Sequence, residues 1–135
     1  MSTPDLPESP HKGQRGLQRL LNALFYSLSG LRIAFTHESA FRQEVALAAV
    51  LIPVACVVRV SAVERALLIG SVLFVLVVEL LNSGVEAAVD RIGFDTHRLA
   101  KRAKDLGSAA VLVALIMLAV TWASIVVPSL AGTSR

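Results

Sequence analysis

The stretch that decides the fold is Glu79-Leu-Leu-Asn82-Ser-Gly-Val-Glu86-Ala-Ala-Val-Asp90-Arg91, which directly follows an apolar run at 66–78. Its four polar side chains at 79, 82, 86 and 90 are spaced by three, four and four residues. At about 100° per residue they fall within roughly 80° of each other and form a polar stripe about 16 Å long on one helix face. Carboxylates at membrane depth are costly and usually face a bundle interior or a water-filled cleft.

Two interpretations of this stripe compete. Polar side chains in a membrane helix can simply join neighbouring helices by hydrogen bonds. A single Asn or Glu favours that interpretation, whereas two Glu, an Asn and an Asp on one face favour a functional site.

The composition places the chain among integral membrane proteins. It has 135 residues, 55% of them hydrophobic and 17% charged, with a mean hydropathy of +0.68, so one membrane domain is expected. The chain has a net charge of +3 and a pI of about 9.6. In a membrane protein, such an excess of Lys and Arg usually lies in cytoplasmic loops. The sequence lacks a stripe of basic and aromatic residues, so it gives no indication of a nucleic-acid partner. The single cysteine, Cys56, excludes an intrachain disulfide, and no Cys/His cluster indicates a structural metal.

Hydrophobic periodicity predicts an all-α membrane protein. Residues 1–14 are rich in Pro, Ser and Gly and are expected to be a disordered tail before a single membrane domain at 15–135. Residues 15–36 combine a Leu/Phe face with a cationic face, which is typical of a helix at the membrane surface. Apolar runs close to the span length of about 20 residues predict membrane helices at about 41–60, 63–90 and 107–130, separated by a turn at 59–64 and a polar link at 91–107.

The distribution of basic residues predicts the orientation. Five Lys/Arg lie before or at the start of the first predicted span, five lie between the second and third spans, and the remaining three fall on the other side of the membrane. The positive-inside rule then places the N-terminus in the cytoplasm and the C-terminus outside, with the polar stripe near the cytoplasmic interface.

The acidic and basic groups at that interface suit phosphoryl transfer. Glu38 and Glu86 can share Mg²⁺, which takes one or two carboxylates and lets phosphate oxygens complete its octahedron. Lys104 can meet those phosphates as a point charge. Glu79 lies about 10 Å deeper than Glu86 along the helix and is placed to take a proton from a hydroxyl at headgroup level. No Walker A sequence, kinase Gly-rich loop or H-R-D motif appears, so spacing alone does not name ATP.

Three motifs resemble the bacterial integral-membrane diacylglycerol kinases. They are the segments 79–93, Ala40-Phe-Arg-Gln-Glu44 and Ala103-Lys-Asp-Leu-Gly-Ser-Ala-Ala110, in the order and spacing of that family. The resemblance runs from about 16 to 127, which is most of the chain. It implies a homotrimer in the bacterial inner membrane, with three spans and an N-terminal surface helix per subunit. It also implies transfer of the γ-phosphoryl of ATP, with Mg²⁺, to the hydroxyl of diacylglycerol without a phospho-enzyme.

The resemblance also implies roles for individual residues. Glu79 would be the general base, with Asn82 beside it in the active site, and Glu38 and Glu86 would hold Mg²⁺. The nucleotide site would comprise Arg19, Tyr26, Glu38, Glu86, Asp95, His97, Lys104 and Asp105. The lipid site would comprise Arg19, Arg32, Phe41, Arg42, Gln43, Glu44, Glu79, Ser108 and Trp122.

Three positions depart from the family pattern. His37 stands where Asn is usual, Asp95 where Glu is common, and Gly84 where Ala is usual. The glycine loosens a helix by up to about 1 kcal/mol on soluble-helix scales. None of the three removes a proposed catalytic group.

Other functions stay open at this point. An undecaprenol kinase keeps the chemistry and changes the lipid acceptor. A small proton-coupled transporter also places a Glu in a span, but it needs that carboxylate near the midplane rather than at the cytoplasmic edge. A purely structural trimeric membrane protein needs no catalytic group. Among single residues, Arg19 is also explained as a headgroup anchor, Tyr26 and Trp122 as interfacial aromatics, and His97 as a solvated loop residue.

Overall fold

The computed structural model describes residues 16–92 and 98–132. Its helices are α1 (Leu17–His37), α2 (Ser39–Val57), α3 (Ala62–Ile92) and α4 (Arg98–Leu130). This described part of the chain contains no strand, and α2, α3 and α4 are each long and apolar enough to cross a membrane. The prediction of an all-α chain with three long apolar helices is confirmed. The predicted tail at 1–14, Asp95 and His97 lie outside the described residues.

The chain divides into two units, residues 1–33 and 34–135. The described part of the first unit is helical from Leu17, and its large apolar side chains are exposed. Arg19, Tyr26 and Arg32 belong to this unit and are exposed as well.

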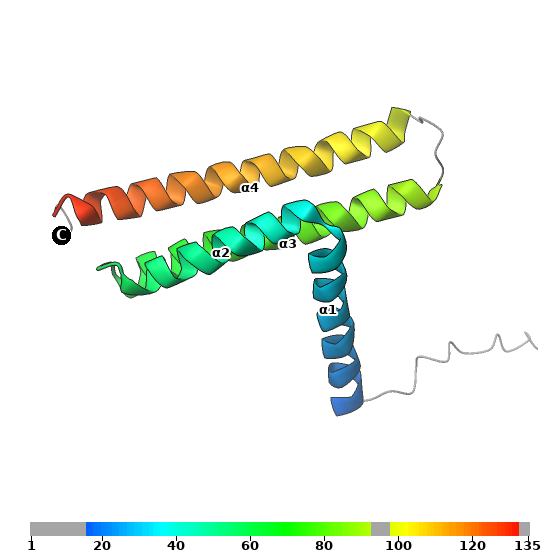
Figure 1. Cartoon of the computed structure of the whole chain (residues 1–135), viewed down its shortest axis with the longest axis horizontal. Coiled ribbons are helices and arrows are strands. Elements are labelled where there is room, and N and C mark those ends of the chain that lie inside the picture. The colour runs from blue at the N-terminus through cyan, green and yellow to red at the C-terminus, as the bar shows by residue number, and fades with distance from the viewer. Residues whose placement is uncertain (1–15, 93–97, 133–135) are drawn as a thin grey trace, which may run out of the picture. The chain divides into compact units, whose positions relative to one another are not determined.

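The second unit contains α2, α3 and α4, which lie alongside one another (Figure 1). Helix α3 packs against both α2 and α4. Five buried residues form the core of the second unit: Ala48, Val72, Val75, Ala114 and Leu118. The alanines on α2 and α4 let the helix backbones approach closely, as small residues do in membrane bundles.

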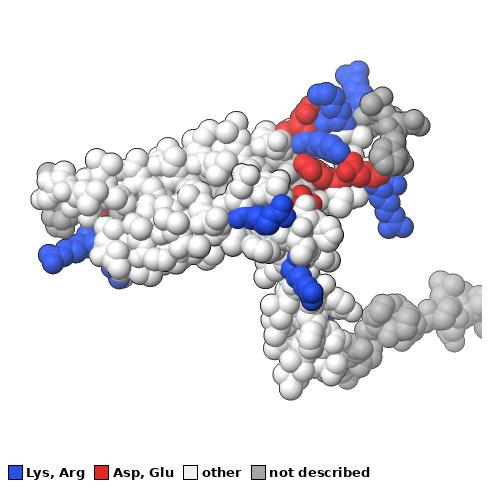
Figure 2. All heavy atoms as spheres, viewed as in Figure 1, with Lys and Arg blue, Asp and Glu red and all other residues white. Residues whose placement is uncertain are grey.

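Charged side chains are concentrated at one end of this unit. Figure 2 shows most acidic and basic side chains gathered where α3 ends and α4 begins, with a long and largely uncharged surface beyond them and a few basic side chains elsewhere. This is the end at which the polar stripe of α3 lies.

Side-chain hydrogen bonds cap the end of α2 and the start of α3 on either side of the turn between them. Helix α2 stops at Val57 rather than near 60, and α3 begins at Ala62. Ser61 and Glu64 form a capping box: the Ser61 amide donates to Glu64 Oε2 over 2.8 Å, and the Glu64 amide donates to Ser61 Oγ over 3.2 Å. Arg65 donates to the carbonyls of Ala55 and Val58 over 3.0 and 3.2 Å, which satisfies acceptors at the end of α2.

Helix α4 begins earlier than the span predicted from hydropathy. It starts at Arg98 instead of 107, because the polar segment before the apolar run is itself helical. Lys101 and Asp105 form an i,i+4 ion pair of 2.8 Å there, a pair that supports a helix on its exposed face. Hydropathy marks the apolar part of a helix, not its polar extension.

Candidate active site

Glu79 is a buried carboxylate at the junction of two clefts. It leaves only 4% of its surface exposed, and it lines both clefts between α2, α3 and α4. The first, here called the acidic cleft, has a volume of about 380 Å³. Its lining is Glu38, Ser39, Ala40, Glu79, Asn82, Glu86, Ser108, Val111, Leu112 and Leu115. The acidic cleft therefore brings together the residues predicted as base and as Mg²⁺ ligands.

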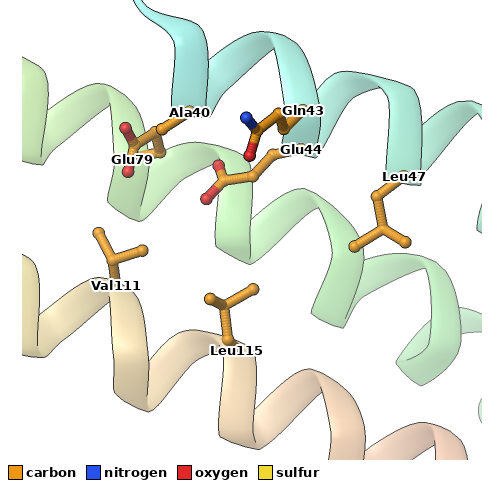
Figure 3. A pocket seen from close by; sticks show the side chains of 7 residues that line it. All are labelled: Ala40, Gln43, Glu44, Leu47, Glu79, Val111 and Leu115. Atoms are coloured by element: carbon orange, nitrogen blue, oxygen red, sulfur yellow. The ribbon is translucent and has the colours of Figure 1, made fainter.

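The second cleft, here called the apolar cleft, has a volume of about 350 Å³. Its lining is Ala40, Gln43, Glu44, Leu47, Glu79, Val111 and Leu115. Figure 3 shows the carboxylates of Glu79 and Glu44 facing the space above Val111 and Leu115 of α4. Among the residues described, Glu44 Oε2 is buried and has no hydrogen-bond partner, so it is a free acceptor beside Glu79.

Asn82 lies one turn beyond Glu79 on α3, and its amide is fixed at the nitrogen end. Its Nδ2 donates to Glu86 Oε1 over 3.2 Å, while Oδ1 is buried and finds no partner within 16–92 and 98–132. The i,i+4 spacing places the two side chains together on the stripe. The hydrogen bond orients the Glu86 carboxylate in the acidic cleft.

Glu38 reaches the acidic cleft from another element. It is the N-cap residue of α2, in an extended conformation, and its side chain makes no capping hydrogen bond to the described backbone. Its carboxylate instead lines the acidic cleft with that of Glu86. Over the described ranges, no group of three or more His, Cys, Asp and Glu residues is placed to hold a metal ion. The two carboxylates fit a Mg²⁺ that arrives with nucleotide phosphates, which supply its remaining oxygens.

The basic residues at this end pair with different acids. Lys104 of α4 pairs with Asp90 of α3 over 2.5 Å, whereas Asp105 pairs with Lys101 within α4. The predicted nucleotide residues Lys104 and Asp105 are adjacent in sequence and make separate ion pairs. Asp90 belongs to the predicted stripe but had no predicted role, although the i+4 step from Glu86 placed it on the same face.

The segment predicted to contact lipid has mixed environments. Phe41 is buried, Arg42 donates to the carbonyls of Phe35 and Thr36 over 3.1 Å each, and Gln43 lines the apolar cleft. Arg42 thereby satisfies acceptors at the end of α1. Ser108 is exposed and lines the acidic cleft.

Trp122, which was predicted to contact lipid, lines neither cleft. The indole of Trp122 donates to the Leu68 carbonyl over 3.3 Å and packs against the core of the second unit. Leu68 precedes Glu79 by about 16 Å along α3. Trp122 therefore joins α3 to α4 well away from Glu79. Arg19, Tyr26 and Arg32 belong to the first unit, and Asp95 and His97 lie outside the described residues.

One close approach of α3 to α4 was not predicted from the sequence. Gly107 of α4 lies so close to Asn82 that a Cβ at position 107 would overlap the amide oxygen. Gly107 lies in one of the three motifs of the sequence, but a contact between residues 25 positions apart on two different helices leaves no signal in local periodicity.

Comparison with known proteins places the chain in a family. The family described as prokaryotic diacylglycerol kinase matches residues 25–126. A diacylglycerol kinase of Pseudomonas aeruginosa is 58% identical over 117 residues, covering 87% of this chain and 95% of the relative. One of Escherichia coli K12 is 50% identical over 107 residues, covering 79% and 88%. One of Haemophilus influenzae is 49% identical over 110 residues, covering 82% and 93%. This chain, with its polar stripe on the second of three apolar helices, therefore belongs to the prokaryotic diacylglycerol kinase family.

Proposed function

We propose that the protein is a membrane lipid kinase that transfers the γ-phosphoryl of MgATP to the hydroxyl of sn-1,2-diacylglycerol, giving phosphatidic acid and ADP. The observation that supports this most directly is the position of Glu79, whose carboxylate lines both the acidic and the apolar cleft. A lipid hydroxyl entering from the apolar cleft and a phosphoryl group held in the acidic cleft meet at this side chain. The activity named for the relatives supports the same reaction.

Glu79 acts as the general base in a direct in-line transfer. The acceptor hydroxyl gives its proton to the Glu79 carboxylate, its oxygen forms the bond to the γ-phosphorus, and the bridging oxygen leaves with ADP. Burial of Glu79 keeps water away from the reacting oxygen. Such positioning and charge neutralisation account for most of the catalysis in phosphoryl transfer.

Glu38 and Glu86 hold the Mg²⁺ that accompanies ATP. When bound, the ion neutralises phosphate charge and orients the transferred group. Asn82 fixes one oxygen of Glu86 by its 3.2 Å hydrogen bond. Lys104 supplies a positive charge on α4 for the phosphates. The family resemblance adds Arg19, Tyr26, Asp95, His97 and Asp105 to the nucleotide site.

The lipid acceptor is held on the other side of Glu79. Gln43 and Glu44 line the apolar cleft with Leu47 and Leu115. Glu44 Oε2, which has no hydrogen-bond partner among the described residues, offers an acceptor to the single free hydroxyl of diacylglycerol as it approaches Glu79, and the apolar side chains receive the start of the acyl chains.

The resemblance also supports a homotrimer in the bacterial inner membrane, with α1 on the cytoplasmic surface. The N-terminus is cytoplasmic in this arrangement, as the positive-inside count indicates. Most of the apolar part of α4 is exposed in the single chain, which leaves surface for lipid and for other subunits.

Two alternatives differ in ways that an experiment separates. Undecaprenol phosphorylation uses the same base and metal residues with another occupant in the apolar cleft. A transporter needs no phosphoryl transfer, and kinase family membership disfavours it.

The test is phosphorylation of lipids by the purified protein in mixed micelles with γ-³²P-ATP. Diacylglycerol, undecaprenol and lipid-free micelles are compared side by side. Labelled phosphatidic acid is the expected product. Label in undecaprenol alone would change the acceptor and keep the mechanism, and label in neither lipid would refute the kinase proposal.

A further inference from the structure

Gly107 and Asn82 are in contact where α3 meets α4. A Cβ built on Gly107 would lie 3.3 Å from Asn82 Cγ and 3.9 Å from its Cβ, and it would overlap Oδ1. At Gly30, Gly70 and Gly84, which also lie in described helices, an added Cβ meets nothing within 4 Å. Gly107 is thus the site at which the missing side chain makes room for a specific group.

The two ends of the Asn82 amide are held in different ways. Nδ2 donates to Glu86 Oε1 over 3.2 Å, and Oδ1 is buried in the space that a side chain at 107 would occupy. Since Oδ1 has no hydrogen-bond partner within the described ranges, shape rather than a polar contact keeps this end in place. A side chain at 107 would require the Asn82 amide to move, and we expect this movement to break the bond to Glu86.

We propose that Gly107 is a positioning residue for the reaction: by leaving room for the Asn82 amide, it sets the hydrogen bond that orients Glu86 in the acidic cleft. This proposal rests on the proposed function for its kinetic consequence, though not for the geometry itself. Gly107 acts through Asn82 and Glu86, since it is not among the residues that line either cleft.

The variant Gly107→Ala separates positioning from stability. The group that must move is the end of a flexible side chain, so the bundle can accept the new methyl group. Alanine also favours a helix interior over glycine, so the thermal unfolding midpoint should stay equal or rise. The value of kcat/KM for MgATP should nevertheless fall roughly 10- to 100-fold, as expected for loss of one hydrogen bond to a charged group.

Gly84→Ala is the matched control. It makes the same substitution two residues from Asn82 on α3, at a position where a Cβ meets nothing within 4 Å. Its kcat/KM for MgATP should stay within about twofold of wild type, as for surface substitutions generally.

A double-mutant cycle tests whether the effect passes through Asn82. Once Asn82→Ala has removed the amide, adding Gly107→Ala should change kcat/KM by less than about twofold. A further loss as large as that of the single variant would show that Gly107 acts independently of Asn82 and would overturn the proposal.

NMR tests whether Gly107 positions the Asn82 amide without any measurement of enzyme activity. In ¹⁵N NMR spectra of the protein in micelles, the Asn82 side-chain amide signal, identified by its loss in Asn82→Ala, should shift in Gly107→Ala and stay in place in Gly84→Ala. An unmoved Asn82 signal, or a fall in activity matched by a fall in the unfolding midpoint, overturns the positioning role. If wild type phosphorylates no lipid, the proposed function fails, while the NMR comparison still decides whether Gly107 sets the Asn82 amide.

Discussion

The ammonium of Lys104 on α4 pairs with the carboxylate of Asp90 on α3 over 2.5 Å, one turn beyond Glu86 on the polar stripe. This contact joins the two helices at the end where charged side chains gather (Figure 2). Lys104 and Asp90 leave 41% and 60% of their side chains exposed, and exposed ion pairs contribute little to stability. The pair is therefore better suited to hold Lys104 near the acidic cleft than to hold the bundle together.

Lys104→Met should raise the KM for ATP by about tenfold or more, because a charge-assisted contact to phosphate is lost. The unfolding midpoint should stay close to that of wild type. Arg102→Met is the matched control, since it removes the same charge two residues away in α4 from an exposed side chain that has no proposed role in the nucleotide site. Equal effects of the two variants on KM would indicate general surface charge instead of a phosphate contact.

Glu38→Gln and Glu86→Gln should each raise the Mg²⁺ concentration that gives half-maximal rate, because each removes one carboxylate from the acidic cleft. The measurement is the initial rate against free Mg²⁺ at saturating ATP. Glu64→Gln, which changes a carboxylate in the α3 capping box, should leave that dependence unchanged. Unaltered Mg²⁺ dependence in both cleft variants would remove the metal assignment.

Trp122→Phe should lower the free energy of unfolding by about 0.5–1.5 kcal/mol through loss of the hydrogen bond to the Leu68 carbonyl. Its KM for diacylglycerol should not change, because the indole packs against the core away from both clefts. Unfolding curves in micelles and diacylglycerol titrations check the two parts. A raised KM with unchanged stability would favour the lipid contact that the sequence resemblance implies.

Arg65→Met should destabilise the fold by about 1–3 kcal/mol, because the carbonyls of Ala55 and Val58 lose a charged donor at the end of α2. The values of kcat and KM measured below the unfolding transition should match wild type, since Arg65 lies at the opposite end of α3 from Glu86. A specific fall in kcat with normal stability would contradict the capping role.

The main features of α3 were predictable from the sequence because they depend on local spacing. The 3.6-residue period placed Glu79, Asn82 and Glu86 on one face, and these residues do line one cleft. The apolar runs predicted the three long helices.

Features that depend on contacts between helices were not predictable in this way. The end of α2 depends on Arg65, which lies beyond the turn and reaches back to Ala55. The packing of Trp122 depends on a carbonyl 54 residues away, and the room for Asn82 depends on a glycine in another helix. The polar start of α4 was missed because hydropathy measures burial in the membrane and not helix formation.

The central claim is that Glu79 is the general base for lipid phosphorylation. The most direct test compares the initial rate of phosphatidic acid formation by Glu79→Gln with that of wild type, with Glu64→Gln as the control variant. Glutamine keeps the shape of the buried side chain and removes its basicity, so the folded variant should lose about 100- to 10,000-fold in turnover. Glu64→Gln should keep the wild-type rate. A Glu79→Gln rate within about tenfold of wild type would contradict the account, because a general base of this kind contributes more than that.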